Sequence, residues 1–170
     1  MKLVRQIKDD LATYGGDWSQ QGFWVLAVHR FGNWRYGVRF APARKLFSAL
    51  YKLAYKSVQV AAGIELPCEA RLGRNFRIDH FGGIVVSGFA SFGDGCVIRN
   101  GVTIGLRHVD QHEAPRIGNN VSVGAGAKIL GPITIGDNVD IGANAVVLED
   151  VPSNCTAVGI PARIISKKRN

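Results

Sequence analysis

Apolar β-branched residues recur at every sixth position through the second half of the chain. The series is Ile117, Val123, Ile129, Ile135, Ile141 and Val147. A helix would spread such a repeat around its surface, whereas a short strand and a turn repeated every six residues would point each aliphatic side chain inward. Glycine directly follows four of these positions, and we attribute it to backbone conformations that other side chains resist. The pattern predicts a β-helix.

The repeat continues upstream, less regularly. Its earlier inward positions are Leu72, Ile78, Val86, Phe92, Ile98 and Ile104. The register shifts by two residues around residues 79–83, and the spacing from Ile104 to Ile117 is thirteen, one more than two repeat units. The polar insert at 106–116 is expected to protrude as a loop, and loops on rigid scaffolds often carry sites. These two irregularities hold three of the four histidines.

The first third of the chain is helical in character. Apolar residues at four-residue spacing predict a short amphipathic helix over residues 2–14, ending at Gly15-Gly16. Residues 20–31 and 43–61 are also predicted helices. The helices are expected to close one end of the coil, where strand edges would otherwise stay unpaired.

We therefore divide the chain into three parts. Residues 1–62 form a helical segment, residues 63–157 form the β-helix, and residues 158–170 form a tail that leaves the repeat at Pro161 and folds back along the coils. The flat faces of such a coil favour self-association.

Composition adds limits to this picture. With 170 residues and 46% hydrophobic content, the chain is one domain, or one domain with an appendage. Cys68, Cys96 and Cys155 show no metal-finger spacing, which predicts reduced thiols in a cytoplasmic protein. Charges interrupt the first ten residues, so we expect no signal peptide. No apolar run is long enough to cross a bilayer.

The net charge of +8 is concentrated partly on the third predicted helix, which has no acidic residue. Its basic residues are Arg44, Lys45, Lys52 and Lys56. The simplest interpretation is a solvated face. The sharper alternative is peripheral contact with the anionic inner face of a membrane, helped by the nearby Trp18, Trp24 and Trp34. Nucleic-acid binding is not expected, because no nucleic-acid-recognition motif accompanies the positive net charge.

Four stretches resemble the hexapeptide-repeat acyltransferases, and within them the serine acetyltransferase family. They are RIDHFGGIVV at 77–86, GVTIG at 101–105, GAGAKILG at 124–131 and GIPAR at 159–163. The resemblance implies a left-handed parallel β-helix with short N-terminal helices, assembled as a homotrimer with acetyl-CoA between adjacent subunits. Handedness comes from the resemblance alone, because the general crossover rule favours the opposite hand.

The resemblance also implies an enzyme, an acetyl-CoA-dependent O-acetyltransferase. Its acceptor would be L-serine or, as in similar short chains, a sugar hydroxyl of a surface polysaccharide precursor. A hydroxyl is too weakly acidic to attack a thioester unaided, and imidazole is the side chain suited to take its proton near neutral pH. A lone histidine in a turn is more often structural, but the resemblance implies that His80 is the base.

Two acidic residues are linked to His80 by the same resemblance. The family places an aspartate fifteen residues before the base, where this chain has Glu65. Asp79 matches a family residue that contacts the acceptor's amino group. Taken alone, Asp79 reads equally well as a turn residue in place of the repeat glycine.

The loop departs from the family pattern. Serine acetyltransferases carry an Arg-His pair before a proline, which holds the carboxylate of serine, whereas this chain has Glu113-Ala114 before Pro115. A carboxylate facing Glu113 would be repelled, which weighs against L-serine. Cations that would hold an acceptor instead are Arg107, His108, His112 and Arg116.

Acetyl-CoA is expected along an edge of the later coils. Its narrow pantetheine arm suits a groove floored by small residues, although glycines serve backbone geometry first. The candidates are Gly105, Gly124, Ala125, Gly142 and Ala143. Candidate phosphate ligands are Arg163, Lys167 and Lys168, with Lys128 a weaker choice.

Two other function classes remain open. One is a zinc-dependent β-helix lyase or hydrolase using His80, His108 and His112, but their order and spacing do not resemble that family, so no metal is expected. The other is a non-catalytic trimeric scaffold.

Overall fold

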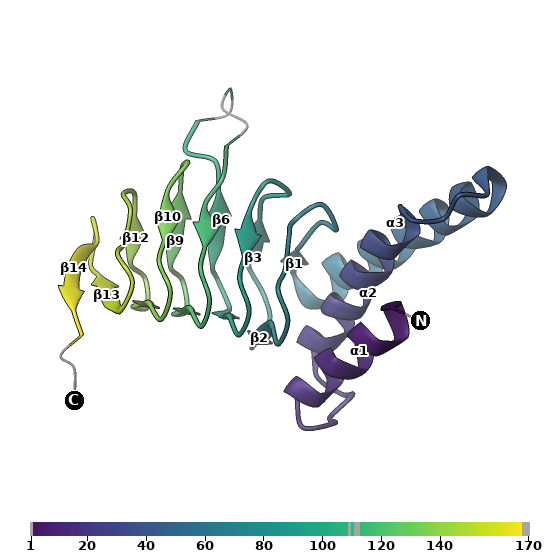
Figure 1. Ribbon diagram of the computed structural model, residues 1–170, viewed down its shortest axis with the longest axis horizontal. Helices are drawn as coiled ribbons and strands as arrows, with labels where there is room; N and C mark the ends of the chain where they lie inside the picture. The colour runs from purple at the N-terminus through teal and green to yellow at the C-terminus, as the bar shows by residue number, and fades with distance from the viewer. Residues whose placement is uncertain (1, 109, 111–112, 168–170) are drawn as a thin grey trace.

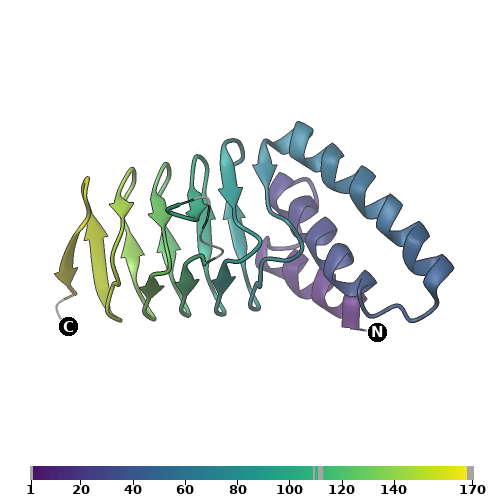
Figure 2. The same ribbon diagram turned by 90° about the horizontal axis from the view of Figure 1, so that it is seen from above.

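The computed structural model describes residues 2–108, 110 and 113–167, in which three helices lead into a coil of short strands (Figures 1 and 2). The helices are α1 (Lys2–Thr13), α2 (Gln21–Arg35) and α3 (Ala41–Ala62). All three predicted helices are confirmed. Helix α2 continues beyond its predicted end, and α3 begins two residues before the predicted start.

The strands are two to four residues long. They are β1 (Ile64–Glu65), β2 (Arg77–Asp79), β3 (Ile84–Val86), β4 (Ser91–Phe92), β5 (Val97–Arg99), β6 (Thr103–Gly105), β7 (Arg116–Ile117), β8 (Ser122–Val123), β9 (Lys128–Leu130), β10 (Thr134–Ile135), β11 (Asp140–Ile141), β12 (Val146–Val147), β13 (Cys155–Val158) and β14 (Arg163–Ser166).

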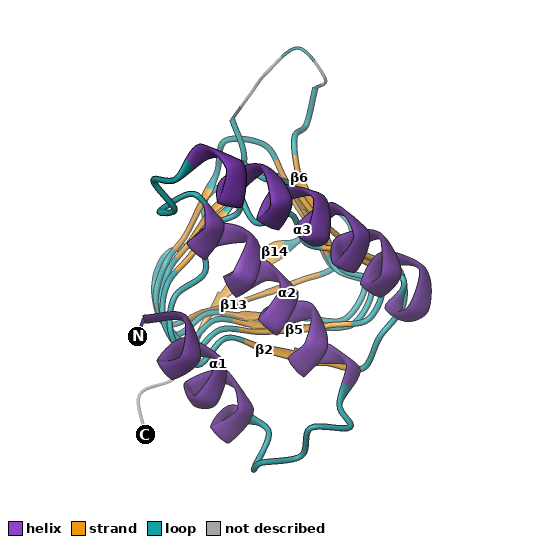
Figure 3. Ribbon diagram, turned by 90° about the vertical axis from the view of Figure 1, so that its right-hand side faces the viewer, coloured by secondary structure: helices purple, strands orange, loops and turns teal. Residues whose placement is uncertain are grey.

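The strands form the three walls of a triangular coil (Figure 3). Sheet A has the order β1-β3-β6-β9-β12, sheet B has β10-β7-β4, and sheet C has β14-β13-β11-β8-β5-β2. Seen from the helical end, the chain passes from sheet A to B to C counterclockwise as it recedes, so the coil is left-handed. The predicted fold class is confirmed.

The repeat residues form the core of the coil. All six positions of the regular series are at most 5% exposed. They stack in register, with Ile98, Val123 and Ile141 aligned on successive strands of sheet C. Each fully buried aliphatic side chain contributes about 1.5–3 kcal/mol relative to exposure, so the inward columns hold the coil together.

The repeat glycines serve a different purpose from the one expected. None of Gly118, Gly124, Gly136 and Gly142 has a positive φ. A Cβ on Gly124 would lie 2.6 Å from the amide nitrogen of Ala143 on the next coil. These glycines are therefore needed for close approach between coils. The left-handed backbone falls two residues later, at Asn120, Gly126, Asn138 and Asn144.

Arg30 ties the helices to the first coil. Its guanidinium donates to the carbonyl oxygens of Leu72 and Gly73 at 3.1 and 2.9 Å. The same group donates to both carboxylate oxygens of Asp10 at 2.9 and 3.2 Å, and both side chains are buried. The helices thus provide hydrogen-bond donors for carbonyl groups of the first coil, which a preceding coil would otherwise supply. This confirms that the helices close this end.

His29 makes a further bond to the first coil and predicts a pH effect. Its Nε2 lies 2.9 Å from the Ala70 carbonyl oxygen. Burial lowers the pKa of His29 to about 4, although this hydrogen bond opposes the shift. The unfolded chain, with a histidine pKa near 6.5, binds more protons below that pH. The free energy of unfolding is therefore expected to fall by roughly 3 kcal/mol between about pH 6.5 and pH 4.

Thermal melts of the parent protein and His29→Gln across this pH range will check the effect. Glutamine keeps a donor for Ala70 but does not titrate, so the parent should lose more stability on acidification. Parallel pH profiles for the two proteins would contradict the prediction.

The far end of the coil is closed by the tail. Strand β14 pairs antiparallel with β13, and Val158 lies opposite Arg163. Cys68, Cys96 and Cys155 are free and buried. Among the residues that the structure describes, no helix has the length and apolar character needed to cross a membrane.

Candidate active site

His80 lies at the corner where the chain passes from sheet C to sheet A, here called the C–A corner. It follows β2 directly, and its side chain is exposed. Its φ is 64°, a left-handed conformation that is uncommon for residues other than glycine. Such strain costs of order 1–3 kcal/mol and clusters at functional sites. Among the described residues of this corner, Asn144 is the other non-glycine residue in this conformation, and His80 is the only ionisable one.

Turns made of small residues stack on the same corner. The amide of Gly101 donates to the Gly82 carbonyl at 2.9 Å, and the amide of Gly126 donates to the Asn100 carbonyl at 2.8 Å. Successive coils lie about 4.8 Å apart. Four expected CoA-binding residues share this edge with His80, namely Gly124, Ala125, Gly142 and Ala143.

Gly105 and the loop lie at the other edge of sheet A. Gly105 ends β6, and the loop leaves the corner between sheets A and B, the A–B corner (Figure 3). Arg107 and His108 are exposed there, and His112 lies outside the described residues. A three-residue strand spans about 10 Å, so a single chain does not bring these loop side chains to His80.

Glu65 projects from the outer face of sheet A. It pairs with Val85 in the strand register. The pKa of Tyr55 on α3 is raised mainly by the burial of Tyr55, and the negative charge of Glu65 adds to this shift. Within residues 2–108, 110 and 113–167, no hydrogen bond or ion pair joins Glu65 to His80. The expected orienting contact is therefore not made within this part of one chain.

Asp79 ends β2 on the sheet C side of the corner. Its carboxylate forms an ion pair with Arg77 at 2.5 Å, and it lies opposite Arg99 on β5. The positive φ belongs to His80 and not to Asp79. The interpretation of Asp79 as the turn residue is therefore wrong, because it continues the strand.

The expected phosphate ligands divide between two corners. Arg163 is exposed opposite Val158, at the end of β13 nearest the C–A corner. Lys167 instead forms an ion pair with Asp140 at 2.7 Å and donates to the Asn138 carbonyl, at the other edge of sheet C. The assignment of Lys167 to the CoA-binding edge is wrong. Because β14 runs antiparallel to β13, it begins near the C–A corner and ends at the other edge of sheet C, where Lys167 follows it. Lys168 lies outside the described residues.

Lys128 lies on the outer face of sheet A but reaches the C–A corner. Its ammonium group donates to the Gly101 carbonyl at 2.5 Å and to the Thr103 hydroxyl at 3.0 Å. It therefore supports the turn stacked against Gly82, a role that the sequence pattern did not reveal.

Comparison with known proteins identifies the family. Residues 114–149 match the family described as bacterial transferase hexapeptide (six repeats). Residues 90–105 match the family described as hexapeptide repeat of succinyl-transferase. A serine acetyltransferase of Synechococcus elongatus is 46% identical over 145 residues, covering 85% of this chain and 57% of that protein. One from Helicobacter pylori is 41% identical over 135 residues, 79% of each protein. The chain belongs to the serine acetyltransferase family.

Solved serine acetyltransferases share the architecture. The Brucella abortus structure has a TM-score of 0.80 at 33% identity, over 96% of this chain and 69% of that one. A serine acetyltransferase in complex with CoA has a TM-score of 0.74 at 32% identity, over 86% of this chain and 57% of that one. The chain spans 46 to 57% of the length of several curated serine acetyltransferases that it matches.

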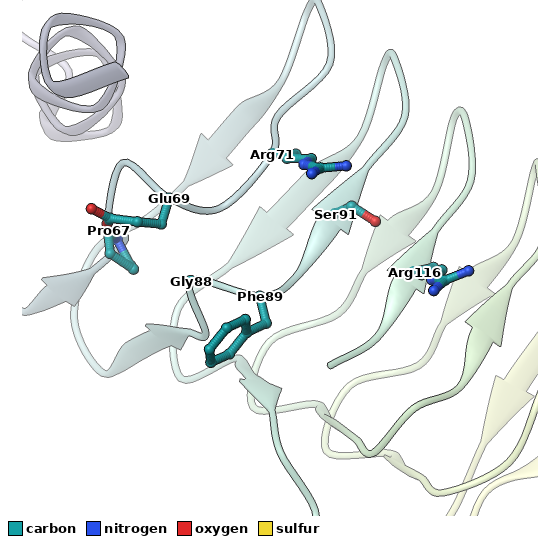
Figure 4. A pocket seen from close by; sticks show the side chains of 7 residues that line it. All are labelled: Pro67, Glu69, Arg71, Gly88, Phe89, Ser91 and Arg116. Atoms are coloured by element: carbon teal, nitrogen blue, oxygen red, sulfur yellow. The ribbon is translucent and has the colours of Figure 1, made fainter. Parts of the chain in front are cut away.

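This member of the serine acetyltransferase family carries a wide groove on sheet B, which the sequence analysis missed (Figure 4). The cavity measures about 970 Å³ and is lined by Pro67, Glu69, Arg71, Gly88, Phe89, Ser91 and Arg116. A neighbouring hollow of about 340 Å³ includes Glu113 and Ala114 of the loop. The available signal was that Arg71, Ser91 and Arg116 each precede an inward repeat residue.

Proposed function

We propose that this protein is an acetyl-CoA-dependent O-acetyltransferase with His80 as general base. The observation that carries the proposal is the exposed, strained His80 on one edge with a stack of small-residue turns, in a chain of the serine acetyltransferase family. The solved relative that holds CoA supports this co-substrate.

His80 would act as a proton carrier. One ring nitrogen accepts the proton of the acceptor hydroxyl as its oxygen bonds to the acetyl carbon. The carbon–sulfur bond breaks, and the imidazolium returns the proton to the departing thiolate. Acetyl-CoA supplies the activated acetyl group, and this exchange leaves an acetyl ester and free CoA.

The small residues of the C–A corner would receive the pantetheine arm. Ala125 and Ala143 stand at successive turns, and neither side chain extends beyond Cβ. Arg163 lies at the same end of sheet C and would meet a phosphate. Gly105 would contribute from the opposite edge of sheet A, on another copy of the chain.

The transferase proposal is tested by the release of free CoA. Purified protein is mixed with acetyl-CoA and a panel containing L-serine, amino sugars and phosphate-linked sugars. Turnover with one acceptor supports the proposal. Absence of turnover with every member of the panel, in protein shown to be folded, contradicts it.

A second copy of the chain would complete the site. His80 lies at one edge of sheet A, and Gly105 with the loop lies at the other. Placing one copy's His80 edge against the next copy's loop edge joins them, and repeating that contact closes a ring. In such a ring of three copies, the homotrimer that the family resemblance implies, sheet A would face the three-fold axis.

Helix α3 presents a leucine seam that fits this assembly. Leu46, Leu50, Leu53 and Val60 are 46 to 77% exposed. With Ser57 they are spaced alternately by four and three residues, the spacing of a coiled-coil seam. An adjacent face packs on α2, where Phe47 contacts Phe31 and Trp34. We propose that these seams meet around the three-fold axis.

The double substitution Leu50→Glu with Leu53→Glu is expected to dissociate the assembly, because buried charges without partners are unfavourable. Sedimentation velocity should show three copies for the parent and a single copy for the variant. Val4→Glu alters an exposed apolar residue of α1 and should leave the size unchanged.

The lysines beside this seam offer an alternative outcome. A single-copy parent that binds anionic phospholipid vesicles, and loses that binding in the double variant, would overturn the seam proposal. It would instead indicate peripheral contact with the inner face of a membrane. We place the protein in the cytoplasm, where free thiols persist.

A further inference from the structure

We propose that the groove on sheet B binds the anionic part of the acceptor, and that the acceptor is a sugar carrying a phosphate or diphosphate group. This inference rests on the proposed transferase function and names its acceptor class. The inference is carried by Arg71 and Arg116, which line the groove. Among the described residues, no carboxylate forms an ion pair with either guanidinium.

Arg71 and Arg116 form a basic row with Ser91 between them. The backbone of Arg71 forms an isolated parallel β-bridge with that of Ser91, and Ser91 is the register partner of Arg116 in the pairing of β4 with β7. The three residues therefore lie on successive coils. Their side chains project from the sheet in the same direction (Figure 4). Across the described part of the chain, neither guanidinium makes a hydrogen bond or an ion pair.

The spacing of this row favours phosphoryl groups over a single carboxylate. Two coil separations place the backbones of Arg71 and Arg116 about 10 Å apart. One amino-acid carboxylate cannot engage two guanidinium groups from such separated positions unless both side chains converge. A diphosphate, or a phosphate bridging Arg71 or Arg116 and the Ser91 hydroxyl, offers several acceptor oxygens. Guanidinium groups bind such oxygens in bidentate fashion.

The acid of the groove is committed elsewhere. Glu69 accepts a hydrogen bond from the Tyr36 hydroxyl at 2.7 Å, and Cys68 lies beside the same oxygen. Burial acts to raise the pKa of Glu69, but the hydrogen bond from Tyr36 and nearby donors bring it below its ordinary value. Its negative charge therefore faces Tyr36 on the α2 side, which leaves Arg71 and Arg116 to a ligand.

Neighbouring residues suit a sugar ring. Phe89 is 59% exposed and lines both the groove and the adjacent hollow. An aromatic face is electron-rich and attracts the positively polarised C–H groups on one face of a sugar. Glu113 lines the hollow beyond Arg116. Its carboxylate would repel a phosphate but accept hydrogen bonds from sugar hydroxyls.

The groove lies next to the corner that a second copy would approach. Arg116 begins β7 immediately after the loop, and Glu113 belongs to the loop itself. In the proposed ring, this A–B corner meets the His80 edge of the next copy. The phosphate would anchor the acceptor on sheet B, and a sugar hydroxyl would then extend toward the partner subunit's base.

Binding is measured by calorimetry without acetyl-CoA, so that the result does not depend on turnover. The probes are UDP-N-acetylglucosamine, N-acetylglucosamine 1-phosphate, unphosphorylated N-acetylglucosamine and L-serine. A phosphorylated sugar should bind more tightly than the unphosphorylated sugar. Comparing the nucleotide-linked and simple phosphate sugars distinguishes a diphosphate from a monophosphate.

Arg71→Ala and Arg116→Ala should each weaken binding of the phosphorylated probe about tenfold or more, as expected for loss of charge-assisted hydrogen bonds. Arg44→Ala removes the same charge from exposed α3 and should change binding less than twofold. His80→Asn should still bind the probe. Equal binding by the parent and the two groove variants, or equal binding of phosphorylated and unphosphorylated sugar, would overturn the inference.

The transferase function can fail separately. Binding that depends on Arg71 and Arg116 but is followed by no release of CoA supports the groove and contradicts the transferase function. Rapid acetylation of L-serine that is unchanged in both groove variants overturns the acceptor class while leaving the transferase function intact.

Discussion

Replacement of His80 by asparagine is expected to lower the rate of CoA release by about 10²- to 10⁴-fold, the usual contribution of a general base. Asparagine is the matched replacement because this chain already uses it at left-handed positions, including Asn75, Asn120 and Asn154. The turn should therefore persist while the proton acceptor is lost. His80→Ala should lose activity as well, with an added cost in backbone strain.

The measurement is thiol release from acetyl-CoA with the best acceptor of the panel. Circular dichroism and sedimentation of the asparagine variant should match those of the parent. If activity fell only a few-fold in a protein with unchanged size and spectrum, His80 would not be the base. A scaffold protein would show no CoA release at all and would keep its cellular role in the variant.

Replacement of Asp10 by alanine is expected to destabilise the protein by about 3–5 kcal/mol, because it leaves the buried charge of Arg30 without its counter-ion. Both side chains are almost fully buried, with 7% of the Arg30 side chain and 3% of the Asp10 side chain exposed. Arg30 also bonds two carbonyl groups of the first coil, so its displacement would open the helical cap.

Urea unfolding at a fixed protein concentration will measure the loss. The exposed pair of Arg74 and Asp94 provides the control, since Arg74→Ala removes a surface ion pair of small expected effect. The double variant Asp10→Leu with Arg30→Met should be more stable than Asp10→Ala, because no charge stays buried. A loss no larger than that of Arg74→Ala would show that the buried pair does not secure the cap.

The core and the helices of this protein were predictable because their signals are local. A six-residue period determines which side chain faces inward, and Ile129 is buried for the same reason as Ile117. The loop was also visible, since its polar residues break the period. Its ends are less exposed than expected: Leu106 packs against the core, and Ala114 is buried.

The candidate site was predictable only in part. Motif resemblance singled out His80 and the glycines of the later turns, and their catalytic and binding roles remain proposals. Lys167 was placed wrongly because its position depends on the antiparallel return of β14, which no residue near Lys167 specifies. Arg71 and Arg116 were not recognised as a pair, since they are 45 residues apart in the sequence and meet only through coil stacking.

The sequence by itself determined the coil, its inward columns, the three helices and the family, because periodicity and motif residues act over short stretches of chain. Tertiary structure decided which residues share a corner, because that depends on how many residues fill each turn between distant strands. It placed His80 and the loop at opposite edges of sheet A, and it set Arg30 against the first coil. It also assigned the repeat glycines to close packing between coils, a contact that no single repeat contains.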